Sequence, residues 1–140
     1  MNGMPYEHLR WVKRDKVLIL EIVTAQLHGD LIEQKLCDEL LAIWQQAQTT
    51  HAVLDLAAVQ YLTSPVLRAF IALRRSVRNS GGRVILCNVQ SENVLRILTT
   101  TRFITTNGSP VRLFEFASDL ETALTQLEHD PLPLLPDSPG

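Results

Sequence analysis

Residue types that carry out chemistry are sparse in this 140-residue chain. Its four histidines, His8, His28, His51 and His129, are scattered, and no His or Cys/His spacing would converge on a metal ion. The sequence has no glycine-rich phosphate loop, and Ser64 lacks the flanking glycines of a nucleophile elbow. We therefore expect a protein that is not an enzyme and that needs neither a metal nor a cofactor.

Two acidic residues, Asp30 and Glu33, have the spacing of an acid/base pair, but helix capping explains them more simply. An acidic or hydroxyl residue followed three positions later by Glu is the pattern of a capping box at a helix start. The same pattern recurs in Ser118-Asp119-Leu120-Glu121. At Ser64-Pro65, the serine is suited to capping a further helix and the proline to its first position.

Alternation of strand-like and helix-like segments gives the fold class. Apolar alternation predicts strands at residues 6–12, 16–23, 51–57, 83–89 and 111–116. Three- and four-residue spacing with capping signals predicts helices at 30–48, 64–80, 91–98 and from 118 onward. The order β-β-α-β-α-β-α-β-α predicts a single α/β domain over residues 6–128, with a small mixed sheet flanked by about four helices. Residues 1–5 and the proline-rich residues 129–140 are predicted to be tails.

Composition and charge exclude several classes of protein. Thirteen basic and fifteen acidic residues give a net charge of −2, so the chain lacks the basic footprint of a nucleic-acid-binding domain. The apolar run 17–23 is interrupted by Glu21 and is too short to span a membrane. Cys37 and Cys87 lie in apolar patterns, which favours two buried thiols in a reducing compartment. We expect a cytoplasmic protein without membrane insertion.

The segment from the third predicted strand to the following helix contains Leu54-Asp55-Leu56, then Val59-x-Tyr61-Leu62, then a serine at a helix start, and the helix closes in Gly81-Gly82. In these residues the chain resembles the STAS domain family of sulfate transporters and anti-sigma factor antagonists. The resemblance continues through the strand 84–88, the helix 91–98 and Arg102-Phe103, and covers residues 6–128. The order of elements matches the fold of that family.

Within the family, the serine at this junction is the residue that a partner anti-sigma kinase phosphorylates. The family pattern is aromatic, aliphatic, Asp, Ser, a small residue, Gly, Leu, and here the chain has Tyr61-Leu62-Thr63-Ser64-Pro65-Val66-Leu67. Thr63 replaces the Asp, Pro65 replaces the small residue and Val66 replaces the Gly. The resemblance implies phosphorylation at Ser64, with Thr63 as the alternative acceptor and helix capping as the alternative role of Ser64.

A phosphate at Ser64 would be compatible with the fold. Helix N-terminal amides and the helix dipole favour negative charge, and Arg68 lies one turn further along. The effect of the phosphate should therefore fall on a partner surface. Arg68, Arg75 and Arg78 fall near one line of the predicted helix, and they either meet an acidic partner or form an ordinary solvated face.

The function implied by the resemblance is that of a bacterial anti-sigma factor antagonist, a regulatory phosphoprotein that binds an anti-sigma factor kinase and is released by phosphorylation. Its partner surface would comprise Tyr61, Leu62, Thr63, Ser64, Pro65, Val66, Arg68 and Arg75. Two alternatives remain open, a constitutive STAS scaffold subunit and an accessory subunit of a membrane transport complex. The sequence also leaves a homodimer open.

Overall fold

A five-stranded mixed sheet forms the centre of the protein in the computed structural model, which describes residues 6–104 and 114–129. Its strands are β1 (Leu9–Arg14), β2 (Val17–Ile22), β4 (His51–Asp55), β6 (Val84–Cys87) and β7 (Glu115–Ala117), in this spatial order. β1 pairs antiparallel with β2, and the other neighbours are parallel. The predicted mixed sheet is confirmed. β1 begins three residues later than predicted, and residues 111–113 of the last predicted strand lie outside the described residues.

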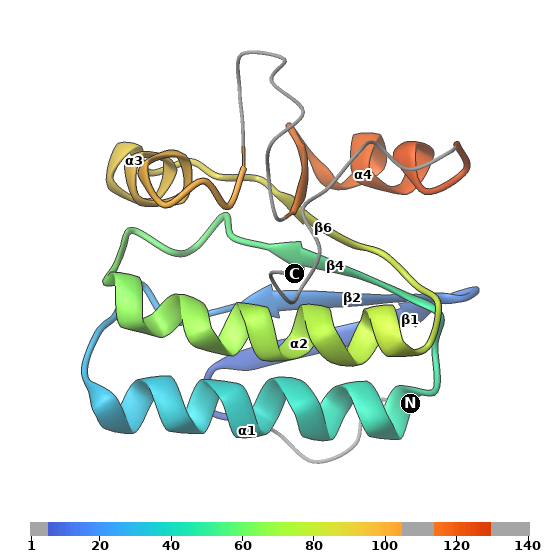
Figure 1. Ribbon diagram of the computed structural model, residues 1–140, viewed down its shortest axis with the longest axis horizontal. Coiled ribbons are helices and arrows are strands. Elements are labelled where there is room, and N and C mark those ends of the chain that lie inside the picture. The colour runs from blue at the N-terminus through green and yellow to red at the C-terminus, as the bar shows by residue number, and fades with distance from the viewer. Residues whose placement is uncertain (1–5, 105–113, 130–140) are drawn as a thin grey trace, which may run out of the picture.

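Helices cover both faces of this sheet (Figure 1). α1 (Asp30–Ala47) and α2 (Leu67–Asn79) lie side by side on one face, and both begin at the same end of the molecule. α3 (Glu92–Thr100) and α4 (Leu120–Gln126) lie on the other side, where α4 contacts β4, β6 and β7. This arrangement confirms the α/β class.

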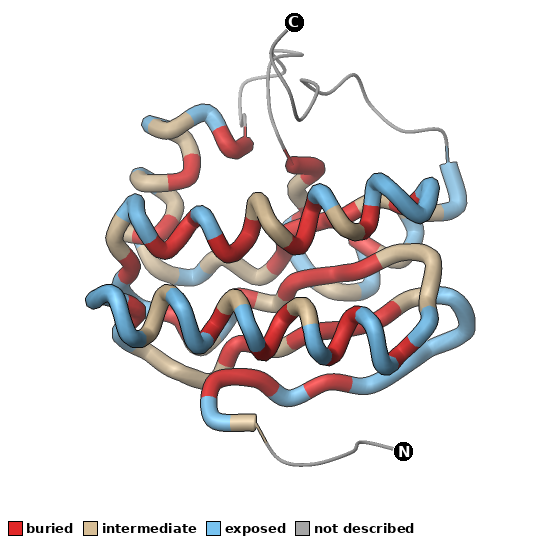
Figure 2. Tube along the Cα trace, turned by 60° about the horizontal axis from the view of Figure 1, so that its bottom comes forward, coloured by how far each residue is buried: buried red, intermediate tan, exposed pale blue. Residues whose placement is uncertain are grey.

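Burial follows the two periodicities of the sequence. The apolar stripe of α2 that was predicted from its spacing is buried, as Leu67, Phe70, Leu73 and Val77 are each at most 2% exposed. Figure 2 shows the buried residues along the central strands and on the inner sides of α1 and α2, with exposed residues on the outer sides. Burial of these faces supplies the main driving force for the fold.

A second, very small sheet was not predicted. β3 (Gln26–Leu27) and β5 (Tyr61–Leu62) are parallel strands of two residues each. Two residues are too few to show any periodicity, so no sequence pattern marks them. The pair nevertheless matters because it joins the segment before α1 to the segment before α2.

Three predicted helix caps differ from those observed. Gly29, with a φ of 97°, is the N-cap of α1, and Asp30 is already inside the first turn without a capping bond. Asp119 rather than Ser118 caps α4, and its carboxylate accepts a hydrogen bond from the Thr122 amide at 2.8 Å. For α1 and α4, the observed cap lies one residue away from the position that the Ser/Asp-x-x-Glu spacing indicated. The third correction concerns Ser64 and is described below.

The cysteines are only partly as predicted. Both are free thiols; Cys87 is buried and Cys37 is half-buried. Burial raises the pKa of the Cys87 thiol to about 12, and the carboxylates of Asp55 and Asp119 add to this effect. Among residues 6–104 and 114–129, every helix is too short or too polar to cross a membrane.

Candidate functional site

Ser64 lies at the start of a short 3-10 turn, η1 (Ser64–Val66), that leads directly into α2. Thr63 has extended backbone angles and is the N-cap of this turn, and its carbonyl accepts a hydrogen bond from the Val66 amide at 3.0 Å. Neither η1 nor α2 has a side-chain capping bond. The predicted capping role of Ser64 is therefore wrong, because Thr63 is the N-cap and its backbone carbonyl accepts the first hydrogen bond of the turn. Ser64 is exposed.

Buried anchors on both sides hold Ser64 in place. Leu62 and Val66 are 1% and 0% exposed, so these two predicted partner-binding residues form part of the core instead of the surface. The Leu62 amide donates to Oδ1 of Asn93 in α3 at 3.3 Å, and the Thr63 amide donates to the Leu27 carbonyl at 3.1 Å. The chain just before Ser64 is thus fixed to α3 and to β3, and the buried Val66 anchors the chain just after it, while Ser64 itself is exposed.

Arg68 connects this site to α1. Its Nη1 lies 3.4 Å from Oε1 of Glu33, which brings the first turns of α1 and α2 together. The Arg68 side chain is 76% exposed, so this ion pair adds little to stability and the guanidinium remains accessible to other anions. Arg68 is four residues after Ser64 and lies in the first turn of α2, which follows η1 directly.

The other arginines of α2 are further from Ser64 or lie in the interior. Arg75 is exposed, but seven helical residues place it about 10 Å along the axis from Arg68, so the structure does not bring it to Ser64. Arg74 is 2% exposed, and its guanidinium carbon lies 5.9 Å from the centre of the Phe114 ring. Burial lowers the pKa of Arg74 to about 10. Arg68, Arg75 and Arg78, the three residues of the predicted basic line, are all exposed on α2, and the buried Arg74 is not one of them.

Two exposed apolar side chains, Leu31 and Tyr61, lie at the end of the molecule where α1 and α2 begin (Figure 1). Of the large apolar residues that the structure describes, three are exposed: Val12, Leu31 and Tyr61. Leu31 is in the first turn of α1, and Tyr61 precedes Ser64 by three residues, with the His28 ring edge-on at 6.1 Å. Aromatic and apolar groups of this kind mark protein contacts. Sequence reasoning missed Leu31 and His28; the available signal was a leucine on the polar side of an amphipathic helix.

The described residues bring together no group of three or more His, Cys, Asp or Glu side chains that could hold a metal ion. The site around Ser64 presents an exposed hydroxyl, the exposed guanidinium of Arg68 and an apolar rim. We call the set Tyr61, Ser64, Pro65, Arg68 and Leu31 the Ser64 surface.

Comparisons with known proteins agree with this architecture. The sequence profile of the STAS domain matches residues 9–123. Among solved structures, a putative anti-sigma factor antagonist from Thermotoga maritima has a TM-score of 0.63 at 19% identity, with 86% of this chain and 95% of that chain covered. An RsbS variant from Moorella thermoacetica has a TM-score of 0.62 at 18% identity, covering 87% and 96% of the two chains.

A third similar structure is the anti-sigma factor antagonist SpoIIAA in its unphosphorylated form. Its TM-score is 0.58 at 11% identity, with 84% of this chain and 94% of that chain covered. At these identities the three structures show a shared fold. The comparison with curated proteins found no match.

Proposed function

Because the chain belongs to the STAS domain family, we propose that it is a bacterial anti-sigma factor antagonist acting in the cytoplasm. In this proposal it is not an enzyme. It binds an anti-sigma factor of the serine-kinase type through the Ser64 surface, and phosphorylation of Ser64 ends the interaction. Thr63, which is half-buried and serves as the backbone cap of η1, is the less suitable acceptor.

One observation carries the proposal: Ser64 is exposed, has no capping role and lies between two buried anchors. A serine that stabilised the helix by capping would have a structural reason to be there. Here the structural roles belong to Leu62, Thr63 and Val66, and Ser64 is available to another molecule. A fixed backbone also presents the hydroxyl to a kinase in one geometry, which favours recognition.

A phosphate at this position would act on the partner and leave the fold intact. It adds about −1.5 to −2 charges at neutral pH, next to a helix start and one turn before Arg68, where negative charge is tolerated. Pro65 supplies no amide, so the phosphate would have one donor fewer than an ordinary helix start gives. In a complex that covers Leu31 and Tyr61, the same charge would have to be desolvated, and this weakens binding.

A second function, a constitutive STAS scaffold, is favoured by Val66 and Pro65. Val66 is fully buried where the family pattern has a glycine, and Pro65 lies in η1. A kinase that requires close approach to a glycine would meet a filled position instead. In that case the same surface would bind a partner permanently.

The two functions are separated by affinity capture from native lysate with the wild-type chain, Ser64→Asp and Ser64→Ala as baits. Ser118→Asp is the matched control, since Ser118 is an exposed serine beside the start of α4. We expect a kinase-like regulator to be retained by the wild type, Ser64→Ala and Ser118→Asp, and lost by Ser64→Asp. Mass spectrometry of residues 61–68 should find phospho-Ser64. Equal retention by all baits with Ser64 unmodified would contradict the switch and favour the scaffold.

A further inference from the structure

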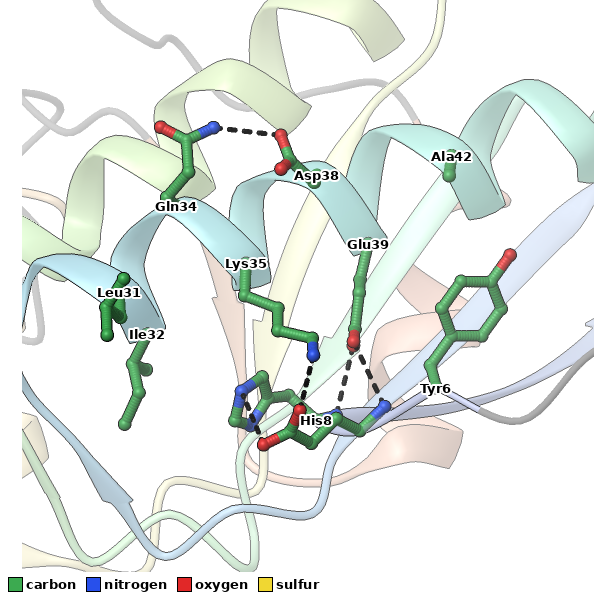
Figure 3. Close-up of a pocket in the computed structure, with 10 residues that line it drawn as sticks. Tyr6, His8, Leu31, Ile32, Gln34, Lys35, Asp38, Glu39 and Ala42 are labelled. Atoms are coloured by element: carbon green, nitrogen blue, oxygen red, sulfur yellow. Dashed lines mark hydrogen bonds and ion pairs between the residues drawn. The ribbon is translucent and has the colours of Figure 1, made fainter.

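A groove of about 720 Å³ lies between the outer side of α1 and the chain that enters β1 (Figure 3). It extends from Leu31 and Ile32 in the first turn of α1 to Tyr6 and Ala42 at its other end. Eleven helical steps separate Leu31 from Ala42, a length of about 16 Å. The groove does not include Ser64 and no part of the proposed switch explains it.

The polar groups at the bottom of this groove already have partners. The buried Glu39 carboxylate accepts hydrogen bonds from the backbone amides of Glu7 and His8, each at 3.0 Å. The buried His8 ring lies 2.6 Å, through Nδ1, from Oγ1 of Thr24. These bonds tie residues 7 and 8 to the middle of α1, so the groove has a fixed floor and needs no polar ligand to complete it.

The groove presents apolar surface to water along its length. Leu31 is 88% exposed, although leucine is among the residues most often buried. Ala42 is exposed, and Ile32 and Tyr6 are half-buried. Three helical turns of an apolar face would fit the distance from Leu31 to Ala42, which corresponds to the spacing of anchors when a helix binds in a groove.

The charges around the groove favour an occupant with positive charge. α1 contains four acidic residues and one basic residue, Lys35. The Lys35 ammonium forms an ion pair with the Glu7 carboxylate at 2.6 Å. Asp38 is exposed and accepts a hydrogen bond from the neutral Gln34 side chain. The groove thus has three carboxylates, from Glu7, Asp38 and Glu39, and one ammonium.

From this shape and charge we infer that the groove is a docking site for a basic amphipathic helix of a partner protein. Its apolar side would cover Leu31, Ile32 and Ala42, and its lysines or arginines would lie beside Asp38. The contact needs no phosphate on Ser64. It goes beyond the proposed function because it adds a second attachment surface, on the outer side of α1.

The test uses the purified full chain and two synthetic 16-residue helical peptides. Both have Leu at helical i, i+3, i+4, i+7 spacing, and the remaining positions are Lys in one peptide and Glu in the other. Kd values are measured by calorimetry, and the contacts are located by ¹H–¹⁵N NMR. Variants are Leu31→Ser and Asp38→Lys in the groove, with Val12→Ser on β1 and Glu128→Lys after α4 as matched exposed controls.

The inference predicts that the Lys peptide binds, that it shifts amide signals of residues 31–42, and that the Glu peptide does not bind. Leu31→Ser should weaken binding at least tenfold, as expected when one leucine contact is lost. Asp38→Lys should weaken the binding of the Lys peptide, and both control variants should bind this peptide with the same Kd as the wild type.

Binding of the Lys peptide that is insensitive to both groove variants would overturn the inference, as would preference for the Glu peptide. Sedimentation of the free chain gives a third way to refute it. A dimer that is lost in Asp38→Lys would assign the groove to a second copy of this chain instead of a partner helix.

Discussion

At the scale of single residues, Arg83 joins several separate parts of the chain. Its backbone amide donates to Nδ1 of His51 at 3.0 Å, which links the starts of β6 and β4. Its guanidinium makes two hydrogen bonds to the nearly fully buried Glu115 of β7, and it also donates to the backbone carbonyl of Gln126 at the end of α4. A bidentate pair of this kind fixes geometry as well as charge.

The stability of the protein should depend on the His51 ring remaining neutral. Burial lowers the pKa of His51 below 6.5, and the charge of Arg83 lowers it further. Below pH 6.5 the unfolded chain therefore binds more protons at this position than the folded chain, so stability is lost as the pH falls. We expect the free energy of unfolding in urea to decrease more between pH 7.5 and 5.5 for the wild type than for His51→Asn. Equal decreases would show that other groups control the acid response.

At the scale of elements, the turn between α2 and β6 depends on two glycines with different roles. Gly81 has a φ of 83°, a left-handed conformation that favours glycine. Gly82 has no such angle, but a Cβ at this position would lie 1.7 Å from the carbonyl oxygen of Thr50, which is backbone. The sequence predicted the helix end at these glycines, but the close approach to residue 50 is visible only in three dimensions.

Replacement of these glycines by alanine should separate the two roles. Gly82→Ala must displace the backbone at the start of β4, and we expect it to cost about 3 kcal/mol, as strong overpacking does. Gly81→Ala meets no atom within 4 Å and carries the conformational cost alone, about 1 kcal/mol. Chemical denaturation of both variants tests this order. A more harmful Gly81→Ala would mean that the close contact at Gly82 relaxes easily.

Most elements could be predicted from sequence because their apolar spacing reflects burial. The stripe of α2 and the alternation Leu18, Leu20, Ile22 in β2 match the observed core. The short β3 and β5 have no period, and the true caps depend on how the chain enters each helix. For the candidate site, the motif pointed to Ser64. The absence of a capping bond at Ser64 and the exposure of Leu31 could be seen only in the three-dimensional structure.

At the scale of the whole molecule, the site is formed where several elements begin. Glu33 and Arg68 bring the starts of α1 and α2 together, and the β3–β5 pair fixes the segments that lead into both helices. The groove along α1 opens at Leu31, which also belongs to the Ser64 surface. A partner could therefore contact both surfaces, with the modification acting on one of them.

The most direct test of this account is the affinity of the captured regulator for the chain carrying phospho-Ser64, measured beside the unmodified chain. Site-specific incorporation of phosphoserine avoids the need for the kinase itself. We predict a Kd at least tenfold higher, which corresponds to a loss of about 1.4 kcal/mol of binding free energy. The thermal unfolding midpoint should stay within about 2 °C of that of the unmodified chain, because the fold is not altered. An unchanged Kd would contradict the switch at Ser64.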